Sequence, residues 1–317
     1  MTSTERPVER LSNPRADRVR RTASLAGRSA RQRQGLFLAE GPQPVREALT
    51  LWLRRWEVSP GSGDGPTASA ELPSLDALYY EPESLRHRVD LATLLDRVFT
   101  VLADPGRDLP RSARPFLREC SAEVLLAIGD AQTSQGVLAV CRFPATPPSP
   151  ATSCQDTGLA IAMLRVQDPG NAGTIIRAAD AAGAGVVLIG PGTVDPWSPK
   201  VVRSAAGSHF HVPLVPAADP QMITTAAGAA GLQVLAAHGR AETSLADLPG
   251  LDRPTLWLMG NEAQGLTSQE LSLADSAVSI PLYGQAESLN VATAATICLY
   301  STAMAQHRVE YRDSGRR

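Results

Sequence analysis

The second half of the chain alternates between short apolar runs and amphipathic stretches of helix length. Apolar runs occupy residues 158–166, 185–190, 232–238 and 255–260, and alanine-rich segments such as 174–183 lie between them. This alternation is typical of parallel strands joined by helical crossovers, whose sheet is covered on both faces. The sequence therefore predicts an α/β domain built on a parallel sheet.

A proline-rich segment marks the predicted boundary of this domain. Residues 143–153 contain four prolines, which stiffen the chain and prevent a helix, so we interpret them as a linker. Residues 1–142 then form a small N-terminal mixed α/β domain, and residues 154–317 form the sheet domain. Within the first domain, residues 58–74 are rich in Gly, Ser and Pro and are expected to form a flexible insertion.

The composition excludes several classes of protein. Of the 317 residues, 43% are apolar and 20% are charged, which favours a folded chain over a disordered one. No run of about eighteen uncharged apolar residues occurs and the N-terminus is polar, so we expect neither a membrane span nor a signal peptide. The four cysteines lack the paired spacing of a zinc ribbon or a disulfide framework. We expect buried thiols, no metal and a cytoplasmic location.

Arginine is concentrated at the start of the chain. Residues 1–35 hold nine arginines against three acidic residues, although the whole chain has a net charge of −2. A basic arm of this kind is suited to the phosphates of a nucleic acid, and a solvated basic helix has the same composition.

Several common catalytic motifs are missing from the sequence. No G-x-G-x-x-G follows a predicted strand, and the chain contains no Walker A loop, no H-E-x-x-H pair and no G-x-S-x-G elbow. A nicotinamide- or flavin-dependent oxidoreductase on a doubly wound sheet is therefore disfavoured, as are the usual kinases and hydrolases.

Polar residues instead gather in three loops that follow predicted strands. The first loop (residues 167–173) reads QDPGNAG, the second loop (260–266) reads GNEAQGL, and the third loop (280–291) runs from IPL to ESLNV. Parallel α/β sheets bind ligands at the carboxyl ends of their strands, so these loops are where a site is expected.

The three loops, together with KVVRSAAGS at residues 200–208, resemble the SpoU (TrmH) family of RNA ribose 2'-O-methyltransferases. The match spans about residues 158–306, and all the blocks come in the family's order. Residues 18–20, 31–49 and 134–140 more loosely resemble the substrate-binding domain of ribosomal-RNA members of the family.

The resemblance implies an S-adenosylmethionine-dependent homodimer whose second domain contains a deep trefoil knot. It implies catalytic roles for five residues, namely Arg177, Asn171, Glu262, Ser288 and Asn290. It implies a cofactor pocket formed by the second and third loops, with contacts from Leu258, Gly260, Asn261, Gly265, Ile280, Leu282, Ser288, Leu289 and Asn290. The RNA contacts expected from the basic arm and from residues 200–204 are Arg18, Arg20, Arg21, Arg31, Arg33, Lys200, Arg203 and Ser204.

Methyl transfer to a ribose requires the 2'-hydroxyl to lose its proton as its oxygen attacks. A guanidinium cannot easily accept that proton, because its pKa exceeds about 12. We therefore assign Arg177 to holding the phosphate of the target and to stabilising the developing alkoxide, with the proton leaving to a phosphate oxygen or to water. The general base stays unassigned.

The same residues also have plain structural interpretations. Asn171 and Ser288 stand where helices begin and suit N-caps, and Glu262 suits the cap of a short helix that starts near Thr267. Arg177, Lys200 and Arg203 are equally compatible with solvated surface positions.

The favoured function is methylation of a ribose 2'-hydroxyl in structured RNA, with 23S ribosomal RNA as the favoured substrate. DNA lacks the 2'-hydroxyl and is not an expected substrate. The alternatives are a transfer-RNA 2'-O-methyltransferase, an antibiotic-resistance rRNA methylase and a non-catalytic RNA-binding factor of the same fold.

Overall fold

The computed structural model describes residues 10–57, 70–145 and 148–314, which form two compact units. Unit 1 consists of Met1–Ala145 and Trp197–Phe210, and unit 2 consists of Thr146–Pro196 and His211–Arg317. The chain first passes from unit 1 to unit 2 after Ala145, inside the proline-rich segment 143–153. Residues 146 and 147 and most of the insertion predicted at 58–74 lie outside the described residues.

Unit 1 is built on a mixed sheet, which confirms the predicted N-terminal mixed α/β domain. The four strands in its described part have the order β1-β4-β2-β3, in which β4 is antiparallel to both neighbours and β3 is parallel to β2. The strands are β1 (Leu36–Glu40), β2 (Ser74–Tyr80), β3 (Phe116–Glu119) and β4 (Val137–Arg142). The helices are α1 (Asp17–Ala23), η1 (Ser24–Ala26), α2 (Arg28–Gln34), α3 (Pro42–Trp56), α4 (Pro82–Leu85), α5 (Val89–Ala103), η2 (Arg111–Ala113), α6 (Ala122–Ile128), α9 (Pro199–Ser204) and η3 (Ser208–Phe210).

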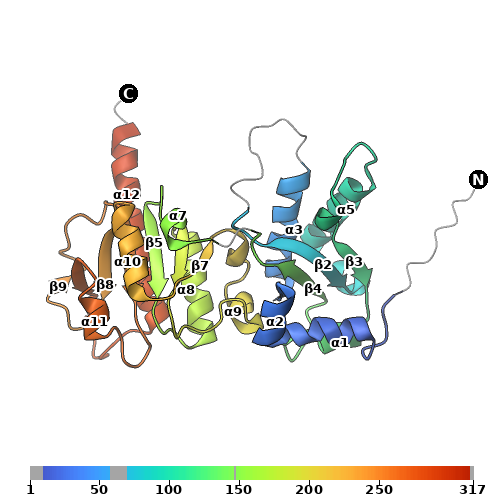
Figure 1. Ribbon diagram of the computed structural model, residues 1–317, viewed down its shortest axis with the longest axis horizontal. Helices are drawn as coiled ribbons and strands as arrows, with labels where there is room; N and C mark the ends of the chain where they lie inside the picture. The colour runs from blue at the N-terminus through green and yellow to red at the C-terminus, as the bar shows by residue number, and fades with distance from the viewer. Residues whose placement is uncertain (1–9, 58–69, 146–147, 315–317) are drawn as a thin grey trace, which may run out of the picture. The chain divides into compact units, whose positions relative to one another are not determined.

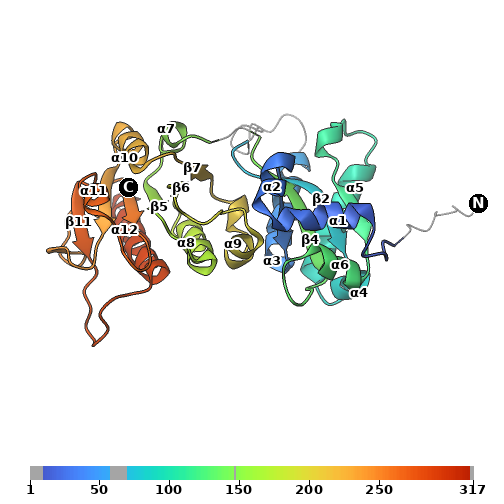
Figure 2. The ribbon, with the colours of Figure 1, turned by 60° about the horizontal axis from the view of Figure 1, so that its bottom comes forward.

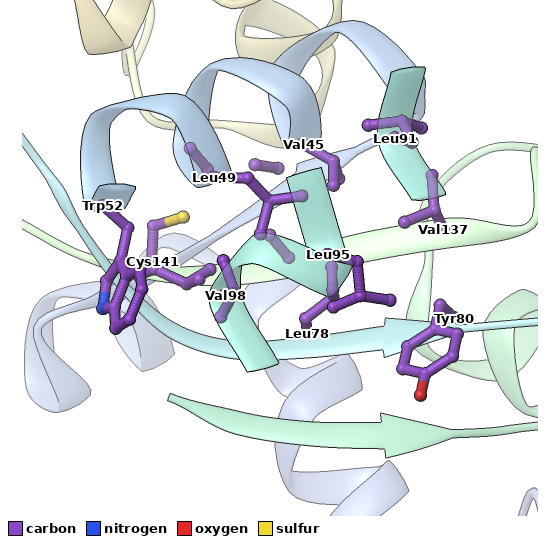
Figure 3. Close-up of a cluster of buried hydrophobic side chains, with 14 of the residues drawn as sticks. Val45, Leu49, Trp52, Leu78, Tyr80, Leu91, Leu95, Val98, Val137 and Cys141 are labelled. Carbon is purple, nitrogen blue, oxygen red and sulfur yellow. The ribbon is translucent and has the colours of Figure 1, made fainter. Parts of the chain in front are cut away.

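Each face of this sheet packs into its own core because strand side chains alternate between faces. Leu78 and Tyr80 of β2 point into a cluster with α3 and α5, which Figure 3 shows. Ala77 and Tyr79 point the other way, into a cluster with α1 and α6. In Figure 1, α3 and α5 accordingly lie on one side of the strands and α1 on the other.

The described part of the basic arm belongs to the second of these cores. Val19 of α1 and Leu25 of η1 are each only 1% exposed, and both pack in the cluster that holds Tyr79. Within residues 10–35, the helices α1, η1 and α2 therefore have a buried side, and their folded backbone positions the arginines on the exposed side.

The segment 197–210 belongs to unit 1, although the predicted division at 154–317 placed it in the second domain. The Trp197 ring lies 4.8 Å from the Phe37 ring, and Val202 and Phe210 are buried in the same cluster. These large apolar side chains complete the core between β1 and α3. Sequence continuity cannot show this packing, because it depends on contacts with residues far away in the chain.

A buried ion pair holds this segment in place. Arg203 Nη1 donates to Glu40 Oε2 at 2.8 Å, and Arg203 Nη2 donates to Asp130 at 3.2 Å. The Glu40 side chain is only 7% exposed, and its Oε2 also accepts from the backbone amides of Asp130 and Ala131, both at 3.1 Å. Removing one partner of such a pair leaves a buried charge with fewer hydrogen bonds.

Unit 2 is built on a parallel sheet, as the sequence predicted. The seven strands in its described part have the order β7-β6-β5-β10-β8-β11-β9, and every neighbouring pair is parallel. The strands are β5 (Leu159–Met163), β6 (Val186–Ile189), β7 (Leu214–Pro216), β8 (Gln233–Ala237), β9 (Thr243–Ser244), β10 (Thr255–Met259) and β11 (Ser276–Ser279). The helices are α7 (Pro150–Ser153), α8 (Pro169–Ala181), α10 (Pro220–Ala229), α11 (Ser268–Leu271) and α12 (Val291–Ser314).

Helices cover both faces of this sheet. Ala160 and Ala162 of β5 pack with Ile223 of α10, whereas Trp257 of β10 points to the other face, where its Nε1 donates to Thr302 of α12 at 3.0 Å. Figure 2 shows α10 on one side of β5 and β6, and α8 and α12 together on the other. The trefoil knot stays a prediction beside this confirmed sheet.

Three further properties concern the described residues. The four cysteines are buried free thiols, and burial raises the pKa of Cys120 and Cys298 to about 12. Within the described ranges, no group of three His, Cys, Asp or Glu side chains is placed to hold a metal ion. None of the helices in the same ranges combines the length and the apolar character that a membrane crossing requires.

Replacing Arg203 by Ala should destabilise unit 1. The substitution leaves the Glu40 carboxylate buried without its cation, and we expect the free energy of unfolding to fall by about 1–3 kcal/mol. Urea unfolding followed by tryptophan fluorescence measures this change. The exposed neighbour Lys200, changed to Ala, should alter it by less than about 0.5 kcal/mol. Equal stability of the two variants would show that the ion pair does not hold the segment.

Candidate active site

The site begins where two central strands of unit 2 end. β5 and β10 are parallel neighbours, and Met163 at the end of one pairs with Met259 at the end of the other. The first loop follows β5 and the second loop follows β10, so both start at the same edge of the sheet. This register brings together segments that are about one hundred residues apart in the chain.

The first loop leads into α8 and leaves the Asn171 side chain free to reach the other loops. Asp168 is the N-cap of α8, because its Oδ1 accepts from the Asn171 backbone amide at 2.8 Å. The alternative interpretation of Asn171 as the cap is therefore wrong. Asn171 lies in the first turn, and its amide side chain bonds to both of the other loops.

Glu262 of the second loop joins the first loop by its carboxylate. Its Oε1 accepts from the backbone amides of Asp168 at 2.9 Å and Gln167 at 3.1 Å, and from Asn171 Nδ2 at 3.3 Å. The expected alternative role of Glu262 as the cap of α11 is also wrong, because Thr267 and Glu270 form a capping box there. Glu262 thus fixes the second loop against the start of α8.

The third loop joins the same network through Asn290. Its Nδ2 donates to Asn171 Oδ1 at 2.9 Å, while its own Oδ1 accepts from the backbone amides of Ala292 at 2.8 Å and Thr293 at 3.3 Å. Asn290 rather than Ser288 therefore caps α12. Ser288 lies two residues earlier and is exposed. Asn171, Glu262 and Asn290 form one chain of side-chain hydrogen bonds across the three loops.

The second loop is a tight turn that only glycine permits at two positions. A Cβ on Gly260 would lie 2.3 Å from the backbone carbon of Gly265, and Gly265 itself has φ +65°. Asn261 and Gly265 pair as an antiparallel bridge, and Asn261 Oδ1 accepts from the Ala263 and Gln264 amides at 3.0 and 3.1 Å. The turn is closed by its own backbone and by the Asn261 side chain.

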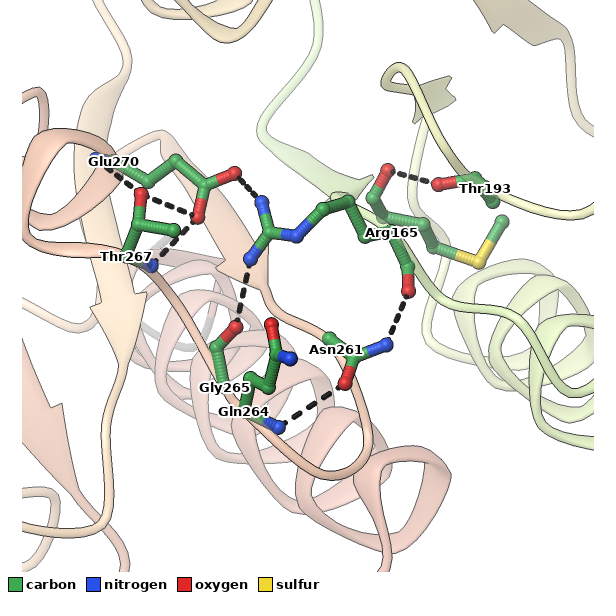
Figure 4. Close-up of polar contacts among 8 residues, drawn as sticks. Arg165, Thr193, Asn261, Gln264, Gly265, Thr267 and Glu270 are labelled. Atoms are coloured by element: carbon green, nitrogen blue, oxygen red, sulfur yellow. Dashed lines mark hydrogen bonds and ion pairs between the residues drawn. The ribbon is translucent and has the colours of Figure 1, made fainter.

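Arg165 anchors this turn from the end of β5, as Figure 4 shows. Its Nη2 donates to the Gly265 carbonyl at 2.9 Å, its Nη1 pairs with the Glu270 carboxylate, and its own carbonyl accepts from Asn261 Nδ2 at 2.9 Å. Arg165 has φ +60°, a conformation rarely adopted by residues other than glycine. The sequence analysis missed Arg165 and Glu270, and only the T-x-x-E spacing at 267–270 was a local indication.

The carboxylates of Glu262 and Glu270 are held in the ionised form. Partial burial alone would raise the pKa of Glu262, but the backbone amides of Asp168 and Gln167 and the Asn171 side chain outweigh it, and the pKa lies below its ordinary value. Burial likewise opposes ionisation of Glu270, and its hydrogen bonds with Arg165 and Thr267 hold its pKa below the ordinary value.

A cavity of about 600 Å³ lies beside the third loop. Its lining includes three residues predicted to contact the cofactor, Ile280, Leu282 and Leu289, and it also includes Tyr283 and Ile297. A pocket of this size with a mainly apolar lining fits the adenosine part of S-adenosylmethionine. Of the other predicted contacts, Leu258 and Gly260 are buried at the end of β10, and Asn261 and Gly265 form the turn.

Arg177 stands apart from the network in the single chain. It is exposed on α8, six residues after Asn171, which on a helix turns its side chain about 120° away from Asn171. Among the described residues it makes no hydrogen bond to the three loops. The structure therefore brings together Asn171, Glu262 and Asn290, and leaves Arg177 free on a neighbouring surface.

The predicted RNA contacts divide into exposed and buried arginines. Arg18, Arg20, Arg21, Arg33 and Lys200 are exposed. Arg31 is only 2% exposed, and its Nη1 donates to the carbonyls of Leu25 and Ala26. Arg203 is held in the ion pair with Glu40, and the neighbouring Ser204 is half-buried. We correct the prediction for Arg31, because its guanidinium is buried in unit 1, whereas the RNA contact of Arg203, whose side chain is 28% exposed, stays a prediction.

A parallel α/β sheet with three polar loops joined at the carboxyl ends of its central strands defines a ligand-binding enzyme domain of the α/β class. The model of the SpoU rRNA Methylase family matches residues 158–300. A 23S rRNA (guanosine(2553)-2'-O)-methyltransferase of Bacillus subtilis is 38% identical over 180 residues, which cover 57% of this chain and 69% of that protein. A 23S rRNA (uridine(2479)-2'-O)-methyltransferase of Streptomyces viridochromogenes is 36% identical, over 69% of this chain and 78% of that protein.

Two solved structures have a similar fold over nearly the whole length of this chain. The AdoMet-bound rRNA methyltransferase from Sinorhizobium meliloti has a TM-score of 0.72 at 26% identity, covering 93% of this chain and 97% of that one. The SpoU methyltransferase AviRb from Streptomyces viridochromogenes, in complex with AdoMet, has a TM-score of 0.68 at 27% identity, covering 93% and 99%. The chain belongs to the SpoU rRNA methylase family. The predicted enzyme class and cofactor are thereby confirmed: it is an RNA methyltransferase that uses S-adenosylmethionine.

The network around Glu262 should open in acid. The pKa of Glu262 is lowered by folding, so its stabilising effect is complete above the ordinary value of 4.5 and is lost as the pH falls through the lower folded value. We expect the amide resonances of Gln167 and Asp168 to titrate with a midpoint below 4.5 in an NMR pH series. In the control variant Glu262→Gln this titration should be absent. A midpoint at or above 4.5 would contradict the assignment.

Proposed function

We propose that the protein transfers the methyl group of S-adenosylmethionine to the 2'-hydroxyl of a ribose in 23S ribosomal RNA. The observation that carries this proposal is the joining of the three loops by Glu262, Asn171 and Asn290 beside a cavity of about 600 Å³. The relatives from Bacillus subtilis and Streptomyces viridochromogenes, both named for 23S rRNA, support this substrate over transfer RNA.

The cofactor would be held by the second and third loops. Ile280, Leu282 and Leu289 would provide apolar contacts for it, and the backbone of the turn at Gly260–Gly265 would provide polar groups. Ser288 and the exposed start of α12 provide further hydrogen-bonding groups. S-adenosylmethionine supplies a methyl group on a positively charged sulfur when it is bound.

The side chains of the chain have two kinds of role in this reaction. Arg177 holds a phosphate of the RNA and stabilises the alkoxide that develops as the 2'-hydroxyl loses its proton to a phosphate oxygen or to water. Its guanidinium has no hydrogen-bond partner in the part of the chain that the structure describes, which leaves it available for that phosphate. Glu262, Asn171 and Asn290 are positioning residues, which keep the three loops in one arrangement while the reacting groups approach.

The two units divide the task. We assign RNA binding to unit 1, whose exposed arginines are fixed on folded helices, and methyl transfer to unit 2, with the proline-rich segment 143–153 as the linker. A ribosomal-RNA substrate supports a cytoplasmic location for the protein.

We also propose that the protein acts as a homodimer. A second cavity, of about 760 Å³, lies between the end of α8 and α12, and Ala181, Tyr300 and Met304 line it. Tyr300 is 39% exposed and Met304 is 53% exposed, which is unfavourable for two large side chains one turn apart on α12. A second copy that covers this face would bury both, and it would lie near Arg177 of α8.

The reaction can be tested with total RNA from cells that lack the gene. The protein and tritiated S-adenosylmethionine should place label in alkali-resistant dinucleotides of 23S rRNA, because a methylated 2'-oxygen cannot attack the adjacent phosphate. Arg177→Ala should lower this transfer by about 100-fold or more, while calorimetry shows cofactor affinity within a few-fold. Label confined to transfer RNA would contradict the substrate, and turnover retained by Arg177→Ala would contradict the catalytic assignment.

The dimer can be tested by a charge on the apolar face. Met304→Glu should convert the dimer to a monomer in light scattering, because an interface that buries the carboxylate must desolvate it. Leu126→Glu is the matched control, since Leu126 is 44% exposed on α6 of unit 1 and should leave the dimer intact. A monomeric wild-type protein at micromolar concentration would contradict the proposal.

A further inference from the structure

Arg18 of α1 lies over an aromatic ring on the edge strand of unit 1. Its guanidinium carbon is 4.0 Å from the centre of the Phe116 ring, and the guanidinium carbon of Arg118 is 5.1 Å from the same ring. Two guanidinium groups from separate elements, a helix and a strand, therefore gather around one aromatic side chain.

The structure holds this ring rigidly. Phe116 begins β3, where it pairs with Ala77 of β2, and its ring lies 6.1 Å from the ring of the buried Tyr79. Phe116 is half-buried at the border of the core that contains α1 and α6. One part of the ring is thus anchored in the core, and Arg18 rests on the part that reaches the surface.

Arg18 forms no ion pair within the described part of unit 1. Arg20 on the same helix pairs with Asp17, whereas Arg18 is exposed and forms no ion pair with any acidic side chain in the described ranges. The same holds for Arg15 and Arg21, which stand three residues before and after it. This exposed set of cations carries no internal counter-charge.

A guanidinium placed in this way suits a base and a phosphate at once. Its planar group stacks on the flat face of a nucleobase, and single-stranded RNA exposes such faces, whereas a duplex hides them. An aromatic ring beneath the guanidinium restricts its rotation and so reduces the entropy that binding would otherwise remove. Arg15 and Arg21 are exposed three residues before and after Arg18, so they provide further cations close to it in the chain.

We propose that Arg18, supported by Phe116, is a stacking site for an unpaired nucleobase of the RNA substrate, with Arg15 and Arg21 as contacts for the adjoining phosphates. The proposal rests on the proposed function, because it presumes that unit 1 binds the RNA. It adds that this unit selects an unpaired nucleotide rather than a duplex.

The test separates stacking from charge. Arg18→Lys keeps the charge but loses the planar group, and Arg54→Lys is the matched control, because Arg54 is exposed on α3 at the opposite face of the sheet. The probes are a twelve-nucleotide single-stranded RNA with one central 2-aminopurine and the duplex of the same sequence. Binding is measured by anisotropy and by 2-aminopurine fluorescence over a series of salt concentrations.

We expect Arg18→Lys to weaken binding of the single strand by about 5-fold or more and to abolish the quenching of 2-aminopurine. Its affinity for the duplex and the slope of its salt dependence should match wild type, because the number of charges is unchanged. Phe116→Leu, which keeps an apolar side chain at the core border, should reduce quenching in the same way. Arg54→Lys should match wild type on both probes.

Two results would overturn the proposal. One is unchanged quenching and affinity in Arg18→Lys, and the other is an equal loss on the single strand and the duplex, which would indicate a phosphate contact alone. Thermal melting checks that each variant is folded. If wild type methylates 23S rRNA while Arg18→Lys behaves as wild type, the stacking site fails and the proposed function stands. If wild type methylates no RNA, the proposed function fails, and the quenching of the oligonucleotide still decides the stacking site.

Discussion

The arrangement of the site depends on one carboxylate that accepts hydrogen bonds from a neighbouring loop. Glu262 follows β10, and the amides of Gln167 and Asp168 follow β5, so the bonds form only because these strands are parallel neighbours in register. An ionised acceptor makes these bonds stronger than neutral ones. The Asn171 side chain donates to Glu262 and accepts a hydrogen bond from Asn290 at the start of α12. Three loops distant in sequence are thereby held together by side chains of the protein itself, which lowers the ordering cost of binding.

The backbone of the second loop supplies the rest of this rigidity. Gly260 permits an approach to Gly265 that any side chain would block, and Arg165 holds the Gly265 carbonyl from the adjacent strand end. Arg165 in turn is fixed by Glu270, whose carboxylate also closes the capping box of α11. The turn is therefore supported by its own hydrogen bonds and by the ion pair of Arg165 with Glu270, so it can present backbone groups to a ligand without rearranging.

Arginine has three different uses in this protein. Arg31 donates hydrogen bonds to carbonyls in its own fold, and Arg203 forms an ion pair with the buried Glu40. Arg18 is exposed and lies over the Phe116 ring. Of these three arginines, only Arg18 is exposed. A count of basic residues in a segment is thus an upper limit on its phosphate contacts, because a guanidinium can equally satisfy buried acceptors in its own fold.

The sequence by itself determined the parallel sheet of unit 2, the mixed α/β fold of unit 1, and the three polar loops that the structure brings together. Hydrophobic periodicity and motif order are local properties, and a parallel sheet places the loops after its strands at one edge. The tertiary structure alone decided that Asp168 and Asn290 cap their helices, that Arg165 anchors the turn, and that 197–210 packs in unit 1. These outcomes depend on competition among partners far apart in the chain, and no sequence window contains both members of such a contact.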